Sequence, residues 1–73
     1  MFYSWTARGR DVNDPPVAQG VLQDLHQAQL AAGKFVQDGR ALVAMVAEHW
    51  PAGDAWYGMA NLSGGITWRK RAQ

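Results

Sequence analysis

No cysteine occurs among the 73 residues of this chain, and this absence restricts what can hold its fold together. Disulfides, thiolate zinc sites and iron–sulfur clusters are excluded, so packed side chains must stabilise the fold alone. The length suits one compact domain over residues 1–73. Because each large aromatic ring buries about 150–250 Å², the four tryptophans are the first candidates for the core: Trp5, Trp50, Trp56 and Trp68.

The longest apolar stretch covers residues 41–47, far short of the roughly 18 residues that a membrane-spanning helix requires. The first residues also lack the basic start and following apolar block of a signal peptide. We therefore expect a cytoplasmic protein that does not use a membrane.

The first half of the chain predicts a strand followed by a helix. Residues 2–6 alternate polar and aromatic side chains in the period of two that is typical of a strand. Asp14 followed by two prolines is typical of a helix start, and Gly33 of a helix end. Between them an apolar stripe recurs with helical spacing: Val17, Val21, Leu22, Leu25, Ala28 and Ala32.

Residues 40–50 predict a second helix, closed by Pro51. Its apolar stripe recurs at i, i+3, i+4, i+7 and i+8: Leu42, Met45, Val46, His49 and Trp50. A rival interpretation takes residues 35–37 and 40–42 as two strands around Asp38-Gly39, a pair that suits a type I′ turn. The helix is favoured because alanine, leucine and methionine dominate residues 41–47.

Residues 55–69 predict a terminal hairpin, since Ser63-Gly64-Gly65 separates two stretches rich in aromatic and apolar side chains. If its last strand pairs with residues 2–6, the fold class is α+β in the order β-α-α-β-β. Two helices would then pack on a short antiparallel sheet formed by the N-terminal strand and the C-terminal hairpin.

The residues needed for catalysis are not arranged in any recognisable motif. His26 and His49 are the two histidines, and neither belongs to an HExxH metal motif, although Asp24 or Glu48 could assist a two-histidine site. Neither GxSxG nor GxxxxGK[ST] is present. We therefore expect a protein that is not an enzyme, with no catalytic residues, no metal and no cofactor.

The distribution of charge is more informative than the formal net charge of +1. Near the two ends of the chain five cations accumulate, whereas the remainder holds two cations and six carboxylates. If the first and last strands pair, these cations and three aromatic rings share one edge. The predicted binding residues are Tyr3, Trp5, Arg8, Arg10, Trp68, Arg69, Lys70 and Arg71.

Three interpretations of this basic aromatic patch stay open: a solvated surface, a protein-binding site and a nucleic-acid-binding site. Tryptophan, tyrosine and arginine often dominate the energy of protein interfaces. In the nucleic-acid interpretation, bases stack on Trp5 or Trp68 while the basic tail neutralises phosphates. Protein binding is favoured, because a pI near 8.2 is low for a nucleic-acid module and no RRM, KH or zinc-finger motif occurs.

The chain opens Met1-Phe2-Tyr3-Ser4-Trp5 and closes with Trp68-Arg69-Lys70-Arg71 before its last two residues. In length, composition and these ends it resembles the small RNA polymerase-binding transcription regulators, or antitermination proteins, of lytic Xanthomonas phages. The resemblance implies a partner, bacterial RNA polymerase, contacted near its RNA exit region on the amino-terminal part of β′ and on the β flap. It also implies inhibition of sigma-dependent initiation and suppression of intrinsic termination, assisted by an elongation factor of the NusA type.

Overall fold

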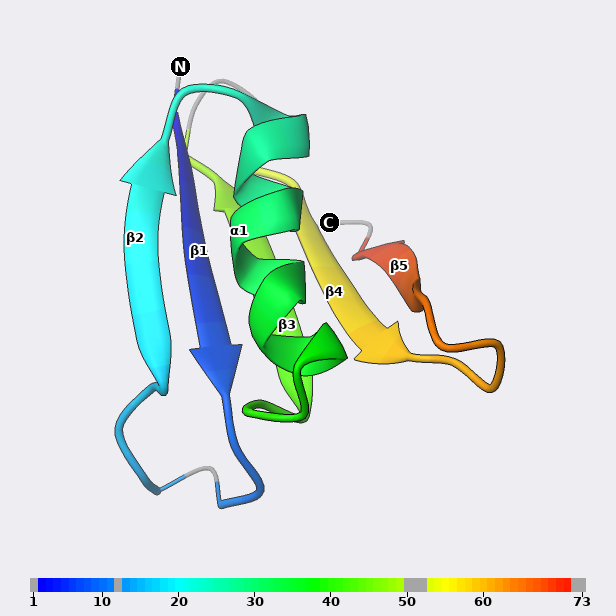
Figure 1. Cartoon of the computed structure of the whole chain (residues 1–73). Helices are drawn as coiled ribbons and strands as arrows, with labels where there is room; N and C mark the ends of the chain where they lie inside the picture. Colours follow the sequence, from blue (N-terminus) through cyan, green and yellow to red (C-terminus); the bar gives the residue numbers. More distant parts are fainter. Residues whose placement is uncertain (1, 12, 50–52, 72–73) are drawn as a thin grey trace.

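The computed structural model describes residues 2–11, 13–49 and 53–71, which form five strands and one helix (Figure 1). The strands make one antiparallel sheet in the order β2-β1-β3-β4-β5. The helix crosses one face of the sheet and leaves the other without a covering element among these residues (Figure 1). In chain order the elements are β1 Tyr3–Arg8, β2 Ala18–Leu22, α1 Leu25–Gln37, β3 Val43–Glu48, β4 Ala55–Ala60 and β5 Ile66–Arg71.

The predicted fold of two helices on a short sheet is therefore wrong in its helix count and in the extent of its sheet. The first predicted helix is in fact a strand followed by a shorter helix, which begins at Leu25 and continues past the predicted end at Gly33 to Gln37. Its opening turns form β2, which pairs along β1 and places Gly20 against the indole of Trp5. The helix begins after Asp24, whose carboxylate accepts a hydrogen bond from the backbone N–H of Gln27 at 3.0 Å.

The second predicted helix is also wrong, because residues 43–48 form the central strand β3, while its last residue Trp50 and the closing Pro51 lie outside the described residues. This strand pairs with β1 on one side and β4 on the other, so sheet partners override the helical propensity of its alanines and methionine. The rival hairpin is wrong as well. Residues 35–37 are the last turn of α1, and Gly39, at φ +75°, turns the chain toward β3.

The terminal hairpin is confirmed, since β4 pairs with β5 over six residues each. At its tip the Asn61 side-chain oxygen accepts hydrogen bonds from the N–H groups of Ser63 and Gly65 at 3.0 and 3.1 Å. The expected pairing of the last strand with the first is wrong: β3 and β4 lie between them. Three strand spacings, about 14 Å, therefore separate β1 from β5.

The core between helix and sheet is built mainly from small side chains. Among the described residues, five of its eight buried hydrophobic side chains are alanines, and Val46 is the largest side chain that is fully buried. Small side chains let the helix approach the sheet closely, which leaves the large rings at the margins. Trp5, Trp56 and Trp68 are partly buried against this core, while Trp50 lies outside the described residues. The buried set is Tyr3, Ala7, Ala28, Ala32, Val36, Ala41, Ala44 and Val46.

Candidate functional site

The predicted basic aromatic patch is divided between two faces of the sheet. Successive strand residues point to opposite faces, so the register assigns each side chain to one of them. The helix side receives four of the predicted residues: Tyr3, Trp5, Trp68 and Lys70. The uncovered side receives Arg8, Arg69 and Arg71, and Arg10 is exposed in the β1–β2 connection. The expected single edge of indoles and cations does not form.

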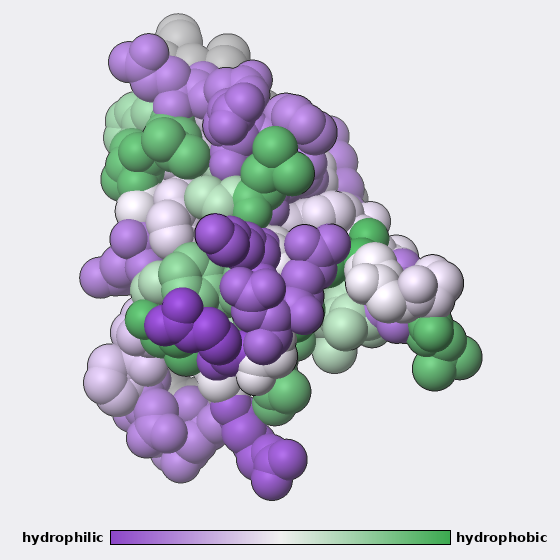
Figure 2. Space-filling view, in the orientation of Figure 1, coloured by the Kyte–Doolittle hydropathy of each residue, from purple (hydrophilic) through white to green (hydrophobic). Residues whose placement is uncertain are grey.

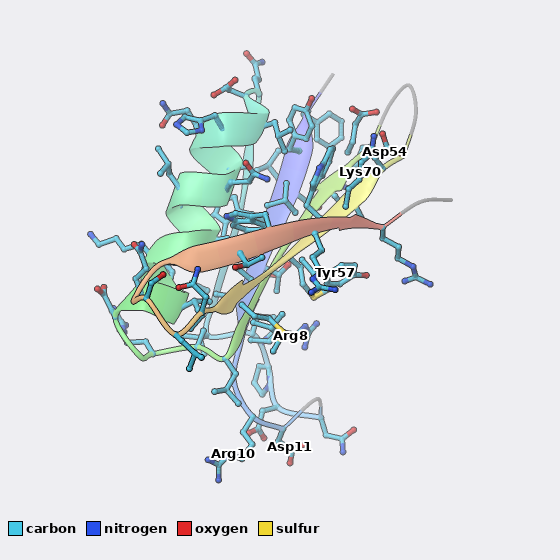
Figure 3. The ribbon with its side chains drawn as sticks, turned by 90° about the vertical axis from the view of Figure 1, so that its right-hand side faces the viewer. Arg8, Arg10, Asp11, Asp54, Tyr57 and Lys70 are labelled. Carbon is cyan, nitrogen blue, oxygen red and sulfur yellow. The ribbon has the colours of Figure 1, made fainter. Side chains whose placement is uncertain are left out.

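On the helix side the aromatic residues fill structural positions. Tyr3 is 8% exposed, and the Trp5 ring stacks on Phe35 with centroids 6.0 Å apart. The Trp68 ring lies so close to Gly58 that a Cβ atom there would be 2.9 Å from it. Lys70 approaches the Trp56 ring at 5.9 Å and forms a 3.0 Å ion pair with Asp54 (Figure 3).

Burial, followed by the neighbouring Glu48 carboxylate and by Asp24, raises the pKa of Tyr3 above its ordinary value of 10.0. The fold therefore favours the neutral phenol, which hydrogen-bonds to Glu48.

This raised pKa predicts how Tyr3→Phe changes the stability of the protein at alkaline pH. Above pH 10.0 the unfolded tyrosine ionises while the folded one keeps its proton, so stability present below that pH is lost as pH rises further. The variant lacks this ionisation. Urea unfolding at about pH 8 and about pH 11 should show a smaller alkaline loss in Tyr3→Phe than in the parent chain. Equal losses would mean that Tyr3 does not titrate differently in the two states.

The uncovered side of the sheet, which we call the open face, combines cations with apolar side chains. Figure 3 shows Arg8 and Tyr57 on the side away from the helix. Arg71 donates a hydrogen bond from Nη1 to Tyr57 Oη at 3.3 Å. The register gives the open face its members: Ser4, Thr6, Arg8, Gln19, Val21, Val43, Met45, Ala47, Ala55, Tyr57, Met59, Thr67, Arg69 and Arg71. No carboxylate of the described residues is among them.

The open face has a depression at its centre, where the side chains are small. Ser4, Ala47 and Ala55 lie in one row across three neighbouring strands. They line a shallow depression together with Met45 and Tyr57. Larger apolar groups are exposed toward the margins, with Val21 at 61% and Met59 at 59% exposure. The surface is therefore hollowed at its centre, apolar in part and positively charged.

The serine of this row, Ser4, also contacts a histidine. His49 Nε2 lies 2.7 Å from Ser4 Oγ, and the Phe2 ring stacks on the imidazole at 4.8 Å. A nucleophilic triad needs a third group that orients the histidine, and among the described residues no carboxylate is hydrogen-bonded to His49. Nor do these residues hold a cluster of three or more potential metal ligands.

Sequence reasoning missed the apolar members of this surface, Met45, Tyr57 and Met59. The period of two already placed Tyr57 and Met59 on one side of the predicted hairpin, whereas Met45 required assigning residues 43–48 to a strand. Among the described residues no helix has the length and hydropathy to cross a membrane. Comparison of the chain with family models, curated proteins and solved structures finds no match.

Proposed function

We propose that this protein is a non-enzymatic regulator that binds another protein through its open face. The observation that carries the proposal is the set of three arginines, Arg8, Arg69 and Arg71, on a face whose described residues include no carboxylate. Around them lie the exposed Met59 and the half-buried Met45 and Tyr57. Methionine and tyrosine, like arginine, are enriched in protein interfaces, where aspartate and glutamate are depleted. An acidic partner surface would complement this face.

A protein partner agrees better with the geometry than a nucleic acid does. The nucleic-acid alternative requires bases to stack on Trp5 or Trp68, and both rings pack on the helix side against the core. Tyr57 is the one aromatic ring among the strand residues of the open face, and the nearby His49 and Phe2 rings stack on each other, so a run of stacked bases finds few free rings there.

Bacterial RNA polymerase is the partner that the sequence resemblance implies, and we adopt it as the specific form of the proposal. A chain of this size acts by occupying a surface: near the RNA exit region it would exclude a sigma contact and hinder formation of a terminator hairpin. The contact would lie on the amino-terminal part of β′ and on the β flap, with a NusA-type factor assisting. The protein would then act in the host cytoplasm.

The test is direct binding to purified bacterial RNA polymerase by the immobilised chain, with labelled single-stranded DNA and RNA measured in parallel. We expect the polymerase to be retained at physiological salt and the oligonucleotides to be lost. If only the oligonucleotides bind, with a log–log salt slope of about −2 to −3 for three arginines, the nucleic-acid alternative replaces the proposal. Failure to retain the polymerase removes it as the partner.

A further inference from the structure

Strand β5 is an edge strand, and its outer side is available for pairing. Among the described residues it pairs with β4 alone. In an antiparallel pair, residues alternate between those that exchange hydrogen bonds with the neighbour and those whose N–H and C=O groups point away. Half of the six residues of β5 therefore direct their backbone groups outward, in the arrangement that accepts an added strand.

A groove runs along this edge on the helix side. It is about 220 Å³ in volume and lies between α1 and β5. Leu30, on its helix wall, is 56% exposed, while Ile66 and Trp68 supply apolar surface from β5. Figure 2 shows this helix side as hydrophilic overall, with separate apolar patches. The other side chains that line the groove are polar, namely His26, Gln29 and Gln37. The groove therefore offers apolar contact at Leu30, Ile66 and Trp68, beside the outer edge of β5.

The charges of β5 identify the chemistry of the added strand. Arg69, Lys70 and Arg71 follow one another and are all exposed. Two copies of β5 paired edge to edge would bring these cations together, which disfavours a second copy of this chain. An acidic segment would instead be attracted by them.

We propose that β5 binds an extended acidic segment of the partner protein as a sixth strand of the sheet. Every second side chain of the segment is apolar and enters the groove beside Leu30 and Trp68. The side chains between them are carboxylates that face Arg69 and Arg71. This inference rests on the proposed function and specifies how the partner is held at one margin of the open face.

The probe is a fluorescein-labelled peptide of ten residues with alternating glutamate and valine, titrated by anisotropy. Two further peptides carry N-methyl groups on every odd or every even residue. In strand addition, only one of these two methylation patterns removes the N–H groups that face β5. That peptide should lose binding, and the other should keep it. Amide exchange should also slow within β5. Equal binding of both methylated peptides, or unchanged exchange in β5, overturns the inference.

Variants of the protein distinguish the contribution of the groove to peptide binding from that of charge and from an effect on folding. Leu30→Asp and Arg69→Glu should each weaken peptide binding about tenfold or more, whereas Arg10→Glu, in the distant β1–β2 connection, should change it little. Thermal unfolding confirms that each variant is folded. If the parent chain retains polymerase but does not bind the peptide, strand addition is contradicted and the proposed function is not. If the parent chain binds neither, the proposed function is contradicted as well. Binding of a single-stranded oligonucleotide in place of the peptide also contradicts it.

Discussion

Replacing Arg8 and Arg71 with glutamate is expected to weaken binding to RNA polymerase about 100-fold, which corresponds to about 2.7 kcal/mol. These two arginines lie on β1 and β5, so together they sample the width of the open face. Each reversal replaces attraction to an acidic partner with repulsion. Because the open face holds no carboxylate among its described residues, the new glutamates meet no like charge on that face.

The matched control is Arg10→Glu with Lys34→Glu, which changes the net charge by the same amount away from the open face. Both side chains are exposed, one in the β1–β2 connection and the other on α1. Biolayer interferometry at two salt concentrations should show near-normal affinity for this control. If the control loses as much affinity as Arg8→Glu with Arg71→Glu, overall charge determines binding and the open face is not the contact.

Gly58→Ala is expected to destabilise the fold by about 2–3 kcal/mol, although alanine is otherwise preferred to glycine in a strand. Gly58 lies on the helix side of β4, directly opposite Trp68. A Cβ atom there would lie 2.9 Å from two atoms of the indole, Cδ2 and Cε3. The ring is rigid, so Trp68 would have to leave its place against the core. Urea unfolding followed by circular dichroism measures the loss.

Gly33→Ala is the control for this substitution, because its new Cβ would meet a flexible atom. The closest contact is Ile66 Cδ1 at 2.8 Å, the far end of a side chain that can rotate. Alanine also gains about 1 kcal/mol over glycine in a helix interior. We expect Gly33→Ala to remain within about 1 kcal/mol of the parent chain. If Gly58→Ala is as stable as Gly33→Ala, the packing of Trp68 does not depend on the absence of a side chain at residue 58.

Residues 43–48 show why the sequence predicted the wrong number of helices. Leu42, Met45 and Val46 satisfy helical spacing, yet Ala44 and Val46 also alternate as the buried side of a strand. A short apolar run fits both periods. What decides between them is the pairing of β3 with β4 and, above all, with β1, whose paired residues lie 35 to 45 positions earlier in the sequence. The terminal hairpin was predictable because its turn and both strands are local.

The candidate site was predictable in its charges but not in its geometry. A strand at the end of the chain already places Arg69 and Arg71 on one side and Lys70 on the other. The sequence did not reveal which of these sides α1 covers, nor that two strands separate Arg8 from Arg71. Both depend on the route of the chain from β2 through the helix into the centre of the sheet.

Hydroxyl-radical footprinting of the complex with RNA polymerase tests most directly whether the open face is the contact. Three side chains of the open face, Met45, Tyr57 and Met59, react with hydroxyl radicals and serve as reporters. Leu22, which lies on the helix side of edge strand β2, serves as the reference. We expect the two methionines and the tyrosine to lose reactivity on binding, while Leu22 reacts as in the free chain. Unchanged reactivity of the three reporters, with protection of Leu22, would show that the partner binds elsewhere.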